Sequence, residues 1–263
     1  MTVAFVFILG LFVGSFLNVV IYRLHRAESF VKGFSKCLFC GHRLYPRDLI
    51  PLLSLLYLRG KCRYCRHKVS WQYFWVELAT ALSFVLIFWY IFAVTDPNIF
   101  LLQLNWLLGL QLIGWWVFAS VLVVIFVYDL RYYLILDKVS LPAVFFALIV
   151  NILLGQSWIS LILAMIIGGG FFFGQFVLSK GKWIGGGDIR LGLLMGAILG
   201  WPGVLLGLFL AYILGGIFAA GLLLFRKKHW GDKLPFGTFL ALATFIILLY
   251  GDILFNWYTS LWL

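Results

Sequence analysis

Charged residues are scarce in this chain of 263 residues: they make up 11% of it, and only nine are acidic. Soluble globular domains carry about 25% charged residues, so this composition excludes an ordinary soluble domain. Apolar residues account for 64% and aromatic residues for 19%. The apolar stretches approach about 20 residues and are continuous rather than alternating, which predicts transmembrane helices and excludes a membrane β-barrel. The predicted fold is an all-α polytopic membrane protein.

Basic residues outnumber acidic residues by twenty to nine, for a net charge of +11. In a soluble protein this excess would suggest nucleic acid, but the sequence lacks the interleaved basic and aromatic residues that bind single strands. In a membrane protein, Lys and Arg mark the cytosolic loops. We therefore expect membrane lipid around the chain and no nucleic-acid partner.

The apolar stretches predict about eight transmembrane helices, at residues 2–22, 71–94, 105–128, 139–154, 158–178, 188–199, 204–225 and from 236 onward. With the N-terminus outside, the cytosolic segments are 23–70, 129–138, 179–190 and 226–235. These contain eleven, two, three and four of the basic residues, which accounts for all twenty and fits the positive-inside rule. Basic residues follow the first helix and none precedes it, so we expect a retained helix rather than a cleaved signal peptide.

The same pattern predicts three parts: a first transmembrane helix (1–22), a small cytosolic loop domain (23–70) and a membrane core of seven helices (71–263). The core also contains predicted turns at 95–98, at Gly155-Gln-Ser157 and at Gly200-Trp-Pro-Gly203, because proline and glycine interrupt helices.

Two acidic residues lie at helix ends that face the cytosol in this topology. The third helix runs inward and ends at Asp129, and the sixth runs outward from Asp188. Such carboxylates are costly unless they are paired, solvated or used. Gly185, Gly186 and Gly187 precede Asp188 and would let an extended peptide approach, because they lack a Cβ. A simpler interpretation is that Asp188 only caps its helix after a flexible turn.

Other features of the core bear on the same site. Gly192, Gly196 and Gly200 share one face of the sixth helix, and we expect this face to allow the close packing that brings the third and sixth helices together. Glu77 and Asp137 are the remaining acidic residues expected at the cytosolic face of the helices.

Two adjacent carboxylates cannot both ionise easily, so they share a proton. One can then act as a base on water while the other polarises a carbonyl. This is aspartic-protease chemistry, and no Ser, Cys or His lies beside a plausible base within a predicted helix. Carboxylates in membranes also form proton or cation relays in ion-coupled transporters. The residues alone leave these two functions open, together with a third in which the chain is a scaffold without chemistry.

All four cysteines lie in the cytosolic loop, as the pairs Cys37-Leu-Phe-Cys40 and Cys62-Arg-Tyr-Cys65. Two C-x-x-C knuckles at this separation are typical of a structural zinc site with four thiolate ligands. Disulfides are the alternative, but the reducing cytosol disfavours them. We therefore predict a structural zinc ion.

Ordered motifs over nearly the whole chain resemble those of the type IV prepilin peptidases, membrane aspartic proteases with a Gly-x-Gly-Asp signature. Besides both cysteine knuckles and Glu77, these motifs are Gly14-Ser-Phe-Leu-Asn18, Ile50-Pro-Leu-Leu-Ser54, Asp129-Leu-Arg131, Gly185-Gly-Gly-Asp-Ile-Arg-Leu191 and Leu234-Pro-Phe-Gly-Thr-Phe-Leu240. The chain departs from the family where Ile135-Leu136-Asp137 replaces Ile-Pro-Asp and where Arg66 replaces a frequent glycine.

The resemblance implies an enzyme of the bacterial cytoplasmic membrane whose active site faces the cytosol. It implies cleavage of the basic leader of type IV pilin or pseudopilin precursors after a glycine, with Asp129 and Asp188 as the catalytic pair. Gly185, Gly186, Gly187, Asp137 and Glu77 would support the site or bind substrate, and Cys37, Cys40, Cys62 and Cys65 would hold zinc. It further implies N-methylation of the new N-terminus with S-adenosylmethionine, although the sequence contains no glycine-rich nucleotide motif after a strand.

Overall fold

The computed structural model of the chain describes residues 1–94, 106–225 and 234–260. In these residues the regular structure is helical, as predicted, apart from two isolated β-bridges. The chain divides into two compact units, Met1–Gln103 and Leu104–Leu263. The turn expected at 95–98 and most of the basic loop expected at 226–235 lie outside the described residues.

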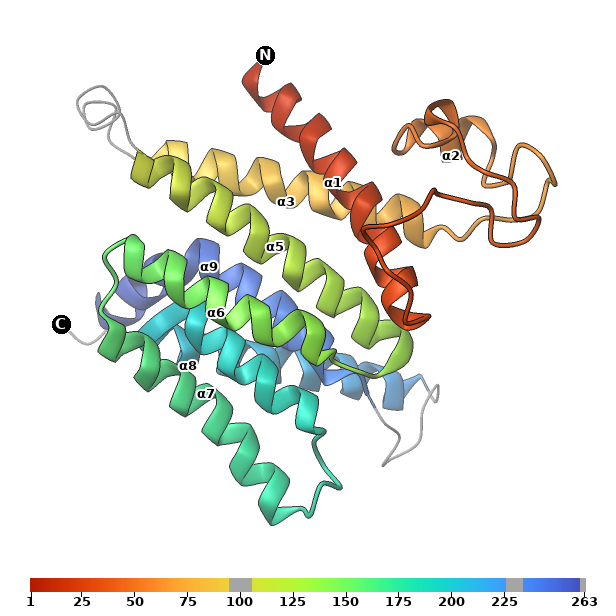
Figure 1. Cartoon of the computed structure of the whole chain (residues 1–263). Helices are drawn as coiled ribbons and strands as arrows, with labels where there is room; N and C mark the ends of the chain where they lie inside the picture. Colours follow the sequence, from red (N-terminus) through yellow and green to blue (C-terminus); the bar gives the residue numbers. More distant parts are fainter. Residues whose placement is uncertain (95–105, 226–233, 261–263) are drawn as a thin grey trace. The chain divides into compact units, whose positions relative to one another are not determined.

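The first unit contains α1 (Thr2–His25), the 3-10 helix η1 (Pro46–Asp48), α2 (Leu53–Tyr57) and α3 (Gln72–Val94). Helices α1 and α3 cross in contact with each other (Figure 1). The contact needs glycine on α1: a Cβ on Gly10 would lie 2.6 Å from the Cα of Ala81, and one on Gly14 would lie 2.7 Å from the Cα of Glu77. Close backbone approach at small residues is how membrane helices pack without a hydrophobic driving force.

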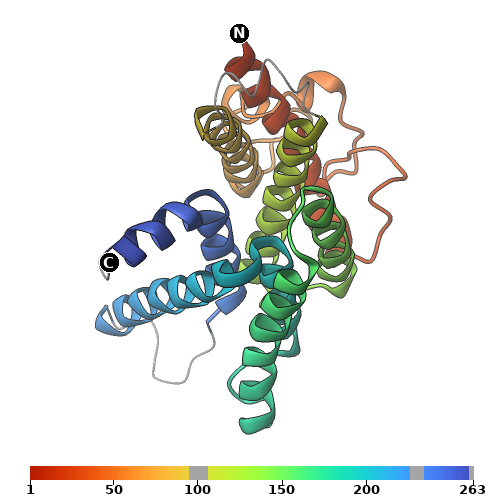
Figure 2. The ribbon, with the colours of Figure 1, turned by 90° about the vertical axis from the view of Figure 1, so that its left-hand side faces the viewer.

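The second unit contains α5 (Trp106–Tyr132), α6 (Asp137–Leu153), α7 (Trp158–Leu178), α8 (Gly186–Leu224) and α9 (Phe236–Ser260). Helix α8 changes direction between its two halves (Figure 2), where Gly200 has φ +62° and Trp201 is also non-helical. The turn predicted at Gly200-Trp-Pro-Gly203 is therefore confirmed. The side-chain amide of Asn151 on α6 donates to the carbonyls of Ala197 and Ile198, at 2.7 and 3.1 Å. These carbonyls lose their helical partners at the break, so Asn151 stabilises it.

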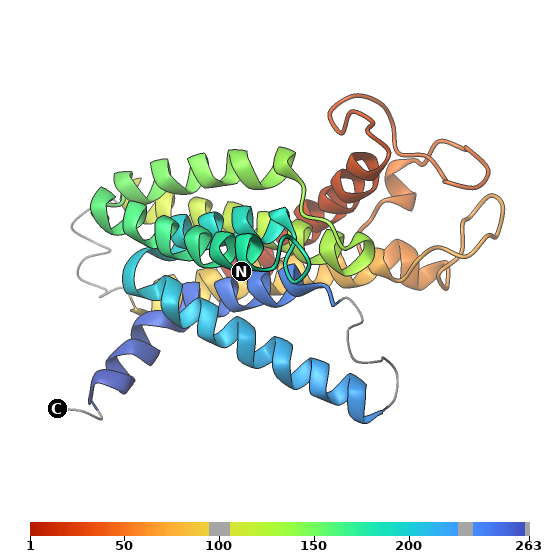
Figure 3. The same cartoon turned by 90° about the horizontal axis from the view of Figure 1, so that it is seen from below.

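The glycine face of α8 packs on α7, not on α5, so the expectation that it joins the third and sixth predicted helices is wrong. A Cβ on Gly192 would lie 2.4 Å from the carbonyl oxygen of Gly168, and one on Gly196 would lie 2.5 Å from the backbone of Ala164. Helix α9 instead contacts both α5 and α8 and runs along α8 in Figure 3. The interior of the unit is apolar and includes Phe118, Leu122, Phe172, Leu194 and Met195.

Six of the described helices, α1, α3, α5, α7, α8 and α9, are long and apolar enough to cross a membrane. Helix α6 has 17 residues, and the broken α8 covers two of the predicted transmembrane segments. A multi-pass membrane protein is confirmed, while the number of crossings and the side of the N-terminus stay predictions.

Candidate active site

Asp129 lies in the last turn of α5 and is 5% exposed. Its Oδ2 accepts a hydrogen bond of 2.9 Å from the backbone N–H of Thr238, and the backbone N–H of Gly237 is a second donor. Both donors belong to the first turn of α9, whose amides have no partner inside the helix. A carboxylate at this helix end also meets the positive end of the helix dipole. Asp129 therefore caps α9 from a different helix.

Asp188 is the third residue of α8 and is half-buried. Helix α8 has Gly185 as its N-cap residue, and the backbone N–H of Gly185 donates to Oδ2 of Asp188 at 3.1 Å. Asp188 thus caps its helix by reaching back from the first turn. The simpler interpretation of Asp188 as the N-cap residue is therefore wrong, because Gly185 holds that position and Asp188 accepts a bond from its amide.

The two carboxylates belong to the same unit, at helix ends that meet around one side chain. Ile135, in the loop between α5 and α6, lies between the helix starts that hold them. A Cβ on Gly187 of α8 would stand 2.9 Å from the Cβ of Ile135, and one on Gly237 of α9 would stand 2.9 Å from its Cδ1. The start of α8, the start of α9 and the end of α5 therefore converge on this site.

The other expected site residues of this unit lie around the start of α8. Asp137, the first residue of α6, forms an ion pair with Arg190, two residues after Asp188. Both side chains are partly exposed. Gly185 and Gly186 are exposed, and a Cβ on Gly186 would meet no atom within 4 Å. The backbone at Gly186 is thus open to an approaching chain.

Glu77 belongs to the first unit and has a structural environment there. It is 6% exposed on α3, and its Oε2 accepts a hydrogen bond of 2.8 Å from the backbone N–H of Leu52. Ser15 of α1 also hydrogen-bonds to it. Glu77 therefore ties the loop before α2 to the contact between α1 and α3.

The four cysteines meet in one cluster, with all Sγ atoms within 4.8 Å of one another. The two knuckles fold alike. The N–H of Cys37 donates to the carbonyl of His42 at 2.9 Å, and the N–H of Cys62 donates to that of His67 at 2.8 Å. Four sulfurs at such distances suit a tetrahedral metal ion, so the residues fit the predicted zinc.

Four thiols gathered this closely are hard to ionise without a cation among them. The backbone N–H of His67 lowers the pKa of the Cys65 thiol, but burial and hydrogen bonds with the other three thiols raise this pKa to about 11. Thiolates this close together need a positive charge among them.

Aromatic rings join the two knuckles to each other. Phe39 of the first stacks on His67 of the second, with ring centroids 3.4 Å apart, and Tyr64 of the second lies 3.7 Å from His42 of the first. Each histidine therefore packs on an aromatic ring of the other knuckle, outside the four-sulfur cluster.

Asp48 supports this loop from its interior, where its side chain is only 2% exposed. Burial raises the pKa of Asp48, but hydrogen bonds from Arg63, from the Tyr45 backbone and from Tyr64 lower it below its usual value. The Arg63 Nε atom lies 2.6 Å from Oδ1 of Asp48, and the Tyr64 hydroxyl donates to Oδ2 at 2.9 Å. Asp48 thus anchors the second knuckle to η1.

Comparison with known proteins identifies the family. Residues 8–91 match the bacterial peptidase A24 N-terminal domain, and residues 116–220 match the type IV leader peptidase family. A prepilin leader peptidase/N-methyltransferase of Aeromonas salmonicida is 33% identical over 97% of this chain and 93% of its own length. The chain belongs to the type IV leader peptidase family. Two proteins of the same name are also similar. The one from Pseudomonas aeruginosa is 33% identical over 93% of this chain and 89% of its own length, and the one from Bacillus subtilis is 29% identical over 97% of both chains. No solved structure matches significantly.

The family assignment confirms the resemblance and the expectation of an enzyme. The stretch matched by the type IV leader peptidase family includes both Asp129 and Asp188, and the N-terminal match includes Glu77 and all four cysteines. Gly237 and Thr238 lie beyond both matches. They bind Asp129 through backbone amides, and sequence reasoning gave them no role. The motif Leu234-Pro-Phe-Gly-Thr-Phe-Leu240 was the sequence signal that could have indicated this role. It has proline at the start of a helix and glycine at the position where a side chain would collide with the Asp129 carboxylate.

Proposed function

We propose that this member of the type IV leader peptidase family is an aspartic endopeptidase that removes the leader of type IV prepilins or pseudopilins at the cytosolic membrane face. One observation carries the proposal. Asp129 and Asp188 are 59 residues apart in sequence, each is bound by backbone amides at a helix start, and those two helix starts meet at Ile135.

The chemistry needs one carboxylate without a proton and one with a proton. The first takes a proton from a water that attacks the carbonyl of the scissile bond. The second donates a hydrogen bond to that carbonyl as negative charge develops on its oxygen. The first then gives the proton it took from water to the amide nitrogen, so that the C–N bond breaks and the leader leaves with a new C-terminal carboxyl group. The amides of Gly237, Thr238 and Gly185 orient the two carboxylates for these roles. Fixed geometry of this kind removes much of the entropic cost of the reaction.

The glycine loop gives the substrate its route. Gly185 and Gly186 are exposed beside Asp188, so an extended leader can approach the backbone without striking a side chain. The relatives' name, prepilin leader peptidase, supports a pilin precursor as substrate. The placement of all twenty basic residues in four segments supports the orientation that faces this loop to the cytosol.

We further propose that Cys37, Cys40, Cys62 and Cys65 hold a structural zinc ion, which when bound closes the loop domain without taking part in hydrolysis. The name N-methyltransferase in the relatives supports a second step in which S-adenosylmethionine methylates the new N-terminus. No residue of this chain is assigned to that step.

Co-expression with a prepilin that carries Gly-Phe at its leader junction tests the peptidase. The wild-type chain should shorten the prepilin on a gel, and Asp129→Asn and Asp188→Asn should each slow cleavage by about 10²–10⁴-fold. Asp252→Asn, the same change at an exposed acidic residue of α9, is the control and should cleave normally. Normal cleavage by either site variant would refute the catalytic pair. If the two site variants cleaved normally but lost an ion flux that the wild-type chain shows, the ion-coupled transporter would be favoured. Transfer of a labelled methyl group to the product would establish the second activity.

A further inference from the structure

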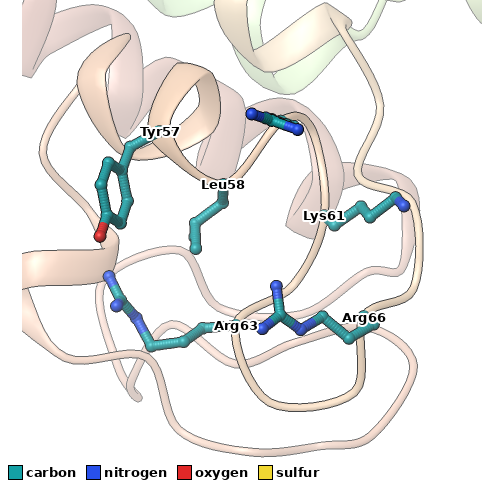
Figure 4. Close-up of a pocket in the computed structure, with 6 residues that line it drawn as sticks. Tyr57, Leu58, Lys61, Arg63 and Arg66 are labelled. Carbon is teal, nitrogen blue, oxygen red and sulfur yellow. The ribbon is translucent and has the colours of Figure 1, made fainter.

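A cavity of about 530 Å³ in the loop domain has a strongly cationic lining: Tyr57, Leu58, Arg59, Lys61, Arg63 and Arg66. The lining contains four basic side chains and no acidic one. Figure 4 shows the guanidinium of Arg66 pointing toward the middle of this cavity, with Tyr57 and the guanidinium of Arg63 on one side. Within the described residues, Arg63 pairs with Asp48, while Arg59 and Arg66 form no ion pair. The cavity therefore has uncompensated positive charge that suits an anion.

The short helix α2 directly before this cavity exposes apolar side chains. Leu53 is 65% exposed, Leu56 is 49% exposed and Tyr57 is 79% exposed. A solvated loop has no reason to present three large apolar residues from a single five-residue helix beside a cluster of arginines. Apolar side chains next to basic ones are typical of segments that lie in the headgroup region of a membrane.

A hydrogen bond ties the N-terminal end of this segment to α3, and Gly60 at its C-terminal end lies near Trp71. Before α2, the Leu52 N–H donates to Glu77, which is the sixth residue of α3 and so lies about 7.5 Å along the helix axis from its first residue. After α2, a Cβ on Gly60 would stand 3.8 Å from the indole nitrogen of Trp71. Trp71 immediately precedes α3, and tryptophans concentrate at the boundary between lipid and water.

Since α3 is one of the helices able to cross a membrane, these contacts place α2 and the cationic cavity at the level of the lipid headgroups. We propose that the cavity lined by Arg59, Lys61 and Arg66 binds the phosphate of an anionic phospholipid, with Leu53, Leu56 and Tyr57 inserted among its acyl chains. The loop domain would then be anchored to the membrane surface at α2. This proposal does not depend on the catalytic roles of Asp129 and Asp188.

Native mass spectrometry of the full-length protein in detergent, titrated with phosphatidylglycerol or phosphatidylcholine, tests the site. The wild-type chain should bind phosphatidylglycerol more tightly, and excess inorganic phosphate should not displace it. The variant R59Q/R66Q should lose about 30-fold in affinity for phosphatidylglycerol, since each basic residue near an anionic surface contributes roughly fivefold. The control K180Q/K182Q removes two exposed charges from the loop between α7 and α8 and should bind as the wild type does.

Retained zinc in R59Q/R66Q would show that its loop domain is folded. If that variant loses zinc, a photo-crosslinking amino acid at Tyr57 in the otherwise unchanged protein decides the question, because in phosphatidylglycerol nanodiscs it should form lipid adducts. Four results would overturn the proposal: equal affinity for the two lipids, displacement by free phosphate, unchanged phosphatidylglycerol affinity in R59Q/R66Q, or no lipid adduct from position 57. A raised KM for prepilin in R59Q/R66Q with unchanged lipid binding would assign the cavity to the substrate instead.

Discussion

The backbone N–H of Thr238 donates a hydrogen bond of 2.9 Å to Oδ2 of Asp129, across 109 residues of sequence. This bond makes the start of α9 part of the proposed active site. Because helix α9 also packs along α8, which contains Asp188, a shift of α9 would change the position of both carboxylates. The motif at 234–240 therefore belongs to the proposed catalytic apparatus although its side chains supply no catalytic group.

Gly237→Ala should impair cleavage without unfolding the protein. The new Cβ would lie 2.9 Å from Oδ2 of Asp129 and 2.9 Å from Cδ1 of Ile135, so the carboxylate has to move. A displacement of about 1 Å can cost roughly 10²-fold in rate. The measurement is the rate of prepilin cleavage in membranes that contain equal amounts of each variant.

Gly216→Ala is the control for this change, because a Cβ at Gly216 on α8 would meet no atom within 4 Å. It should cleave at the wild-type rate. Wild-type cleavage by Gly237→Ala as well would show that the position of α9 does not affect the reaction.

Gly187→Ala and Gly186→Ala should separate the packing role of the glycine loop from its proposed contact with substrate. At Gly187 the new Cβ would stand 2.9 Å from the Cβ of Ile135, so the variant should be less stable, and Ile135→Gly, which removes that Cβ, should partly relieve the clash. At Gly186 there is open space, so thermal stability should stay unchanged while KM for prepilin rises. Unchanged KM in Gly186→Ala would argue against close approach of the leader there. The two substitutions at contacting residues form a double-mutant cycle that measures their coupling.

Much of this site could be predicted from the sequence, because alternation of apolar segments is a strong signal. It placed Asp129 at the end of one helix and Asp188 at the start of another, as the structure has them. The partner of the glycine face on α8 could not be predicted, since Gly192 suits any close neighbour and only tertiary packing selects α7. The role of Gly237 could not be predicted either, because it acts through its backbone amide, a group that every residue except proline possesses.

Asp137→Asn should reduce cleavage less than tenfold, whereas Asp129→Asn should slow it by about 10²–10⁴-fold. The ion pair of Asp137 with Arg190 is partly exposed, with side chains 51% and 38% accessible, and such pairs contribute about 0–1 kcal/mol. The charge-swapped variant Asp137→Arg with Arg190→Asp should recover part of any loss, as judged by initial rates. If Asp137→Asn were as inactive as Asp129→Asn and the swap restored nothing, Asp137 would act directly on the substrate.

Arg66→Gly should stabilise the proposed zinc-binding loop, and Gly41→Arg should weaken it. The two residues occupy equivalent places, four residues after the first cysteine of each knuckle, and both have left-handed backbones, with φ +70° at Gly41 and +58° at Arg66. Each N–H closes its knuckle on the carbonyl of that cysteine at 3.0 Å. A residue with a Cβ pays about 1–2 kcal/mol in this conformation, and glycine does not. The rate at which a chelator removes zinc from the detergent-solubilised protein should therefore fall roughly five- to thirtyfold in Arg66→Gly and rise in Gly41→Arg. Cys65→Ser, which removes a proposed ligand, is the reference for complete zinc loss. Equal release rates in the wild type, Arg66→Gly and Gly41→Arg would show that these turns do not control metal retention.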